Sequence, residues 1–285
     1  MRRRQFLASG TALLSVAVAG CGHPSVVLDM DAATAADIAD EVSMSPEPQS
    51  AEYTVVSEAV ENGTATRRGR YELFDRTDTV RIGDAFYEVS ETALTTGEVT
   101  VYEVRIDFDP ADSTAAVGEV PYEELPAVDR SRLGPILSDD DLPGGDGYDV
   151  GVGYGTASEV GTGSVFVPEQ QYDIVVYDGE RYRVSVETRT ASETEYRYEA
   201  TEVASGVDPF ADRIRDRYLF ALAGLSDAER EAVEEAIDGG YFEDDEAFRA
   251  VTDRIRDHAG IEVTDSYGTW LLEYEGVEYL TYVEW

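Results

Sequence analysis

The chain has 285 residues, and 60 acidic against 22 basic side chains give it a formal net charge of −38. Every one of these basic side chains is arginine, because the sequence contains no lysine. This balance excludes nucleic acid as an expected partner, since phosphate binding needs surplus cations, and it excludes Schiff-base and phosphate-loop lysine chemistry. Hydrophobic residues make up 42% of the chain, which is enough for a folded core rather than a disordered acidic tail.

The N-terminus has the layout of an export signal that ends in a lipid-attachment site. Arg3 and Arg4 begin an RR-x-F-L pattern similar to a twin-arginine signal. The apolar run over 6–20 is shorter than the about 20 residues that a membrane span needs. The run leads into Val-Ala-Gly-Cys, which is similar to a lipobox. We therefore expect residues 1–20 to be a signal peptide and Cys21, the only cysteine, to carry a membrane lipid.

The composition indicates the solvent in which the protein works. Aspartate and glutamate hold water and cations, and molar salt shortens the Debye length to about 3 Å, which screens their mutual repulsion. The signal over 1–21, the lysine-free acidic composition and segments such as YDGERYRV (177–184) together resemble uncharacterised haloarchaeal lipoproteins with twin-arginine signals. The resemblance implies export and anchoring at the outer face of the cell membrane through Cys21, and it implies no particular activity.

Residues 21–50 are small, acidic and proline-bearing, and they predict a lipidated tether with a short helical patch near 32–42. Beyond this segment the sequence is self-similar. Three stretches place apolar residues around a glycine turn, which is typical of a β-hairpin: 82–89, 177–184 and 274–280.

The self-similarity predicts an α+β fold of repeated helix-plus-antiparallel-hairpin units, with mainly antiparallel strands and several amphipathic helices. The units are expected at 51–118, at 119–205 with a Gly/Asp-rich loop over 139–163, and at 206–285, where the helical third unit ends in a hairpin. Helices are predicted over 51–63, 126–137, 209–223, 245–259 and from 226, where Ser226 and Glu229 have capping-box spacing. Strands are predicted over 79–90, 98–108, 172–177, 181–188, 194–203, 269–274 and 277–285.

The sequence offers few candidates for catalysis or metal binding. His23 follows the lipobox and His258 lies near a helix end, so a serine triad and a zinc site of cysteine and histidine are not expected. Four aspartates of the glycine-rich loop could hold a hard cation such as calcium, the one cofactor considered: Asp139, Asp141, Asp146 and Asp149. The alternative is a loop that is simply solvated by salt.

Two surface features each have two interpretations. Asn62 begins an Asn-Gly-Thr glycosylation sequon, but Asn-Gly is also a natural helix end. Tyr182, Tyr196 and Tyr198 alternate with charged residues, so they either stack on a sugar or a partner protein, or pack half-buried in a sheet.

The expected function is that of a surface-tethered, halophilic module for binding or envelope interaction rather than that of an enzyme. The expected partner is an envelope protein or a glycan. The alternative is an extracytoplasmic hydrolase that uses carboxylates, although 60 acids give no specific pair. A solute-binding lipoprotein is disfavoured because the chain lacks alternating β and α segments.

Overall fold

The computed structural model describes residues 25–74, 77–110, 115–138 and 149–285. The fold is α+β with mainly antiparallel strands, as predicted. The chain divides into two compact units. Unit 1 combines the described residues 25–42 with Ala204–Trp285, and unit 2 is Ser43–Val203. In the described ranges, no helix is long and apolar enough to cross a membrane.

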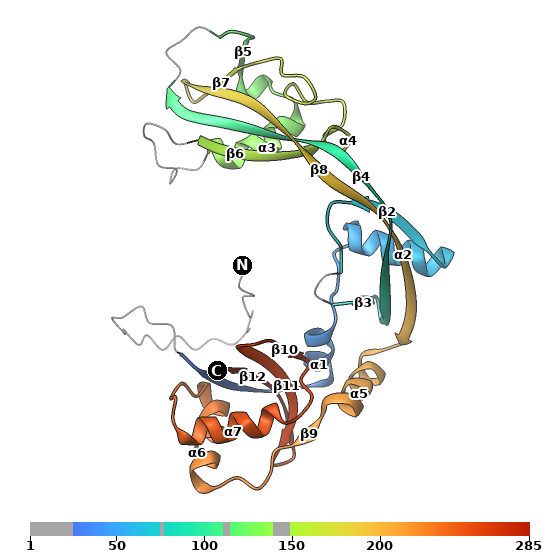
Figure 1. Ribbon diagram of the computed structural model, residues 1–285, viewed down its shortest axis with the longest axis vertical. Helices are drawn as coiled ribbons and strands as arrows, with labels where there is room; N and C mark the ends of the chain where they lie inside the picture. Colours follow the sequence, from blue (N-terminus) through green and yellow to red (C-terminus); the bar gives the residue numbers. More distant parts are fainter. Residues whose placement is uncertain (1–24, 75–76, 111–114, 139–148) are drawn as a thin grey trace. The chain divides into compact units, whose positions relative to one another are not determined.

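Unit 1 is one sheet with helices packed against it (Figure 1). The strand order is β1-β12-β11-β10, and β9 pairs with β11 in parallel. Its elements are β1 (Val27–Ala32), α1 (Ala35–Val42), α5 (Val207–Tyr218), β9 (Phe220–Ala221), α6 (Asp227–Gly239), α7 (Glu246–Arg256), β10 (Glu262–Val263), β11 (Tyr267–Tyr274) and β12 (Val277–Glu284).

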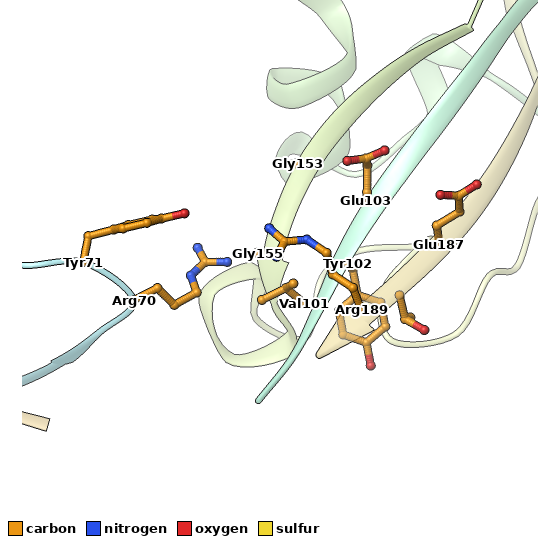
Figure 2. Close-up of a pocket in the computed structure, with 10 residues that line it drawn as sticks. Arg70, Tyr71, Val101, Tyr102, Glu103, Gly153, Gly155, Glu187 and Arg189 are labelled. Carbon is orange, nitrogen blue, oxygen red and sulfur yellow. The ribbon is translucent and has the colours of Figure 1, made fainter. Parts of the chain in front are cut away.

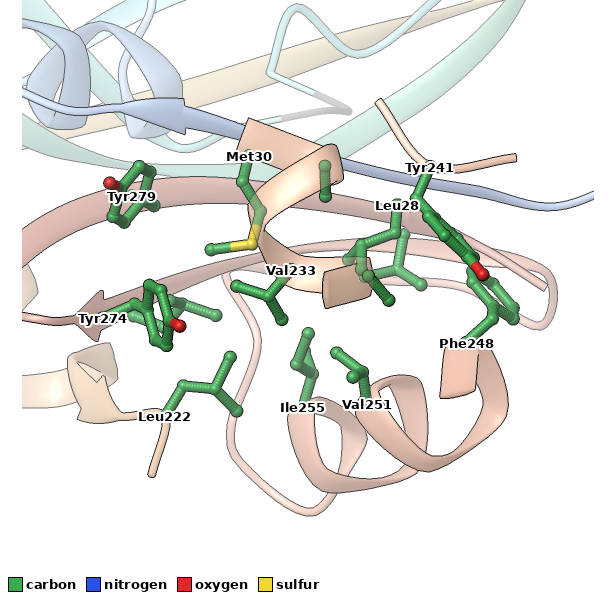
Figure 3. Close-up of a cluster of buried hydrophobic side chains, with 14 of the residues drawn as sticks. Leu28, Met30, Leu222, Val233, Tyr241, Phe248, Val251, Ile255, Tyr274 and Tyr279 are labelled. Carbon is green, nitrogen blue, oxygen red and sulfur yellow. The ribbon is translucent and has the colours of Figure 1, made fainter. Parts of the chain in front are cut away.

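The core of unit 1 lies between the sheet and helices α6 and α7 (Figure 3). Leu28 and Met30 from β1 are fully or almost fully buried, and they pack with Val233 of α6 and with Val251 and Ile255 of α7. Along β1 the buried Leu28 and Met30 alternate with less buried residues, Asp29 and Asp31 among them, as a half-buried strand requires. The first described strand therefore belongs to the same core as the last helices and strands of the chain.

The structure differs here from the predicted tether over 21–50. Helix α1 lies where the short helical patch was predicted, but residues 27–32 form β1, which pairs along its whole length with β12, from Val27 opposite Glu284 to Ala32 opposite Tyr279. The acidic composition of this segment hides a period-two apolar pattern, which is the stronger signal of structure.

Unit 2 is built around two long paired strands, β4 and β8, which Figure 1 shows side by side. The strand order is β3-β4-β8-β7-β5, with β6 also pairing with β4 and β2 with β8. Its elements are α2 (Ala51–Asn62), β2 (Ala65–Gly69), β3 (Thr79–Ile82), β4 (Ala85–Pro110), β5 (Glu119–Pro121), a 3-10 turn (Tyr122–Glu124), α3 (Ala127–Leu137), β6 (Asp149–Thr156), α4 (Ala157–Val160), β7 (Ile174–Tyr177) and β8 (Glu180–Ala204).

Unit 2 has two separate apolar clusters, one toward each end of the long strands. The α2 cluster contains Val56 of that helix, Val80 of β3 and Tyr198 of β8. The α3 cluster contains Leu133 of that helix and Val104 of β4. Between the two clusters, residues 92–98 of β4 are all exposed. β4 and β8 therefore connect two small cores through a stretch of sheet that has no core of its own.

Tight glycine turns connect the hairpins at the predicted places. Asp178 and Gly179 between β7 and β8, and Glu275 and Gly276 between β11 and β12, all have φ between 50° and 85°. Positive φ at both central residues is the conformation that matches the twist of the flanking strands. Between β3 and β4 only Gly83 has positive φ, at 62°. That the three hairpins belong to repeated units stays a prediction.

The strand boundaries differ from the prediction in one respect. The predicted strands 79–90 and 98–108 are β3 and a single β4, and the predicted strands 181–188 and 194–203 are a single β8. Mainly polar segments, 91–97 and 189–193, separated them in the sequence, yet those segments are the largely exposed middle of the long strands. Hydrogen bonding between β4 and β8 continues the strands where the apolar pattern stops.

The predicted capping box at the start of α6 is confirmed. The Ser226 hydroxyl accepts from the Glu229 amide, and the Glu229 carboxylate accepts from the Ser226 amide at 2.6 Å. Arg254 of α7 also donates to Glu229, at 2.8 Å, and so joins the two helices. The hydrogen bond from the Ser226 backbone, followed by that from Arg254, lowers the pKa of Glu229 to about 2.

We predict that Glu229→Gln weakens unit 1 in a pH-dependent way. Because the pKa of Glu229 in the folded protein lies below its ordinary 4.5, its stabilisation is complete above about pH 4.5 and is lost as the pH falls toward 2. At pH 7 the variant should lose about 1–2 kcal/mol of unfolding free energy, measured by chemical denaturation. The difference from wild type should shrink toward pH 2. Glu231→Gln, an exposed neighbour on α6, is the control, and an equal loss in both variants would contradict the prediction.

Candidate functional site

A cavity of about 300 Å³ lies within unit 2, where the segment that follows β2 approaches strands β4, β6 and β8 (Figure 2). It lies beside the end of β4 that pairs with β6. Its lining combines two arginines and two glutamates with tyrosines and with glycine backbone. The lining residues are Arg70, Tyr71, Val101, Tyr102, Glu103, Gly153, Gly155, Glu187, Thr188 and Arg189.

The β6 side of the cavity is formed by a strand with an irregular register. The pairing of β6 with β4 shifts between Tyr102 and Glu103, so Gly155 faces Tyr102 and Gly153 faces Glu103. Gly155 has φ 82°, a value that favours glycine, and an added Cβ there would meet the Glu159 carboxylate. A Cβ at Gly153 would meet no atom within 4 Å. This β-bulge leaves bare backbone at the cavity, the kind of local device that often lies beside binding sites.

Helix α3 fixes the backbone of this bulge. Nη1 of Arg132 donates to the carbonyl oxygens of Gly153 and Tyr154, at 3.1 and 2.8 Å, and the guanidinium lies 5.0 Å from the centre of the Tyr154 ring. One guanidinium group thus satisfies two carbonyls and covers a buried aromatic ring. The position of the glycines therefore depends on α3 rather than on β6 alone.

Helix α3 is itself held by a buried carboxylate. Asp129 is fully buried and accepts from the Ser164 hydroxyl at 2.7 Å and from the Val165 amide at 2.9 Å. Ser164 Oγ in turn accepts from the Phe166 and Val167 amides. Each of these buried polar groups has a partner, as a stable interior requires.

Arg70 reaches the cavity from the end of β2 and binds the start of α4. Its Nη2 lies 3.3 Å from the Glu159 carboxylate, which also accepts from the Thr156 amide at 2.6 Å. Burial acts to raise the pKa of Glu159, but the hydrogen bonds from Thr156 and the charge of Arg70 outweigh it, so this pKa lies below its ordinary value. Arg70 is consequently held in place beside Gly155.

On the long strands, Arg105 is shared between the two glutamates of the cavity. Arg105 lies 3.6 Å from Glu103 on its own strand and 3.3 Å from Glu187 on β8. The guanidinium of Arg189, two residues further along β8, has no hydrogen bond or ion pair with any described residue. Figure 2 shows the guanidinium groups of Arg70 and Arg189 pointing toward one another at the β6 side of the cavity. Two like charges that face the same space favour an anion between them.

The sequence-predicted site residues lie elsewhere. Arg3, Arg4 and Cys21 fall outside the described residues, as do Asp139, Asp141 and Asp146. Asp149 begins β6 and is exposed opposite Asp107 of β4. Among the described residues, no group of three or more His, Cys, Asp or Glu is placed to hold a metal ion. Calcium binding by the 139–149 aspartates stays a prediction.

Asn62 is the last residue of α2, and Gly63 follows it with φ 85°. The Asn-Gly pair therefore ends the helix in the left-handed conformation, as one of its two interpretations expected. Asn62 is also exposed, and its glycosylation stays a prediction.

The tyrosines of β8 and the second histidine have packing roles. Tyr196 and Tyr198 are buried in the α2 cluster, and the Tyr198 hydroxyl donates to Glu91 at 2.9 Å. Tyr182 is half-buried and meets Phe108 edge to face. His258 stacks on Phe220, with ring centres 3.9 Å apart. The idea of a sugar-binding tyrosine face at Tyr196 and Tyr198 is therefore replaced by the packing interpretation.

Sequence reasoning missed the arginines of the cavity. Arg70, Arg105 and Arg189 are far apart in the chain and carry no common motif. The alternating glycines at 151, 153 and 155 were the one local signal, since a strand with glycine on alternate positions leaves backbone accessible on one face.

We predict that Arg132→Gln loosens the cavity by releasing the carbonyls of Gly153 and Tyr154. Loss of hydrogen bonds from a charged group should cost about 1–3 kcal/mol of unfolding free energy in unit 2. Amide hydrogen exchange at residues 152–155 should accelerate. Arg130→Gln on the exposed face of α3 is the matched control and should leave both quantities unchanged. Unchanged exchange at 152–155 in Arg132→Gln would show that β6 holds its own shape.

Comparison with known proteins identifies no relative of this chain. No protein-family model, no curated protein and no solved structure matches it. The role of the cavity therefore has to be inferred from its own residues, which offer cationic, acidic and aromatic groups around exposed backbone.

Proposed function

We propose that the protein is a lipid-anchored binding module of the outer cell surface, whose unit 2 binds a component of the cell envelope. The observation that carries the binding role is the unit 2 cavity, where Arg70 and Arg189 face a common space beside glycine backbone. A concave site with a few convergent polar groups is the usual form of a small-ligand site. We propose that the Arg3–Arg4 signal directs export of the protein and that a lipid on Cys21 anchors it.

The position of β1 supports a close attachment to the membrane. β1 begins at Val27, only six residues after Cys21, and is paired with β12. Six residues span about 20 Å at most. A lipid on Cys21 would therefore keep unit 1 within that distance of the bilayer surface, in place of the longer tether that the sequence predicted.

The composition of the cavity favours binding over catalysis. The residues that line it include no histidine, cysteine or serine. Its two acids, Glu103 and Glu187, face the cavity from neighbouring strands and are the feature that would carry the alternative of a carboxylate-dependent hydrolase. Both contact Arg105, however, and an ion pair of this kind occupies the carboxylates that hydrolysis would need, one of them as a proton donor.

We predict that Cys21→Ser releases the full-length protein from the membrane. Native protein should have an intact mass increased by a lipid and lacking residues 1–20, and it should sediment with membranes. The variant should lose the lipid mass and appear in the medium. An Arg3→Lys/Arg4→Lys variant is the control for the export route and should stay inside the cell. Membrane association of Cys21→Ser with residues 1–20 retained would overturn the anchor.

We predict that filling the cavity abolishes binding to the envelope. The released Cys21→Ser protein should bind isolated cell envelopes saturably, and adding Gly153→Leu should abolish this binding because Gly153 lines the cavity and has room for a side chain. Gly97→Leu, at an exposed position of β4 with equal free space, is the matched control. Equal binding by both double variants would place the envelope-binding surface elsewhere.

A further inference from the structure

We infer that the unit 2 cavity binds a small organic molecule through a single carboxylate, held between the guanidinium groups of Arg70 and Arg189. This inference deepens the proposed binding role and rests on it. Guanidinium forks match the two oxygens of a carboxylate, and they keep their charge at every physiological pH. Figure 2 shows these two groups pointing toward one another beside Gly155, and we place the carboxylate between them.

The charges already paired in the cavity leave one cation for a ligand. Arg105 contacts both Glu103 and Glu187, and Arg70 contacts Glu159. Arg189 is the remaining lining cation, without a partner among the described residues. The two arginines and two glutamates of the lining cancel in charge, so a dianion would leave a larger uncompensated charge in the cavity than a monoanion.

This count selects a monoanion rather than a phosphate. A phosphate monoester carries a charge of about −1.5 to −2 at pH 7. Its second negative charge would be repelled by the carboxylates of Glu103 and Glu187, which also line the cavity. These two carboxylates share a single ion-pair partner, Arg105. A carboxylate carries one charge, which Arg189 neutralises, while Arg70 adds hydrogen bonds from the opposite side.

The remaining lining suits an organic body attached to that carboxylate. The Tyr71 side chain is 75% exposed at the edge of the cavity, beside Arg70. Figure 2 shows the Tyr71 ring and the Arg70 guanidinium on the same side of the cavity. An exposed aromatic ring at the mouth of a site can pack on an apolar or ring-shaped body. A volume of about 300 Å³ lies at the lower end of the range for small-ligand sites.

The test compares carboxylates with their neutral amides on the full-length Cys21→Ser protein. Acetate and benzoate are titrated against acetamide and benzamide at constant chloride concentration, and binding is followed by the amide resonances of Gly153 and Gly155. We expect saturable shifts with the two carboxylates only, with benzoate the tighter. Inorganic phosphate should bind more weakly than benzoate.

Variants locate the site. Arg189→Gln should weaken benzoate binding about tenfold, and Arg197→Gln should change it less than about twofold. Arg197 lies on the same strand, is exposed and removes the same charge, but it does not line the cavity. Equal losses in the two variants, no saturable shift with either carboxylate, or tighter binding of phosphate would each overturn the inference. Envelope binding that survives Arg189→Gln would overturn the inference alone, whereas envelope binding that survives Gly153→Leu would overturn the proposed function.

Discussion

The pairing of β4 with β8 is the constraint on which the rest of unit 2 depends. The strands are 26 and 25 residues long, and each contributes to both apolar clusters. Their pairing brings Arg105 to Glu187, which are 82 residues apart in the chain. It also sets the place where β6 and the end of β2 can approach them. The cavity is a consequence of where the flanking strands begin and end along this shared pair.

The arginines position strands more than they stabilise them. Arg70–Glu159, Arg105–Glu187 and Arg181–Glu119 all join separate elements, and all are partly exposed. Exposed ion pairs contribute little, and concentrated salt weakens them further. The stability of each unit therefore has to come mainly from its apolar clusters. In a chain this acidic, the few cations are more informative about geometry than about stability.

Local signals in the sequence were sufficient for the longer helices, and long-range pairing determined much of what they missed. Ser226 begins α6 as its capping-box spacing predicts, whereas the short α4 lies in a segment predicted as a loop. The middle of β4 and β8 lacks an apolar pattern, so only the partner strand reveals it. β1 was missed because acidic neighbours surround Leu28 and Met30. The cavity was missed because its arginines come from distant segments, and no spacing in the sequence records that they meet.

The pairing of β1 with β12 also sets the order of events during synthesis. β1 is the first described strand, and all of unit 2 lies between it and its partner β12 in the chain. A ribosome hides the last stretch of a growing chain, so β1 has no partner until β12 has left the exit tunnel. Unit 2, which is complete earlier, has the opportunity to fold first. Unit 1 can close only once β12 has been synthesised, after the whole of unit 2.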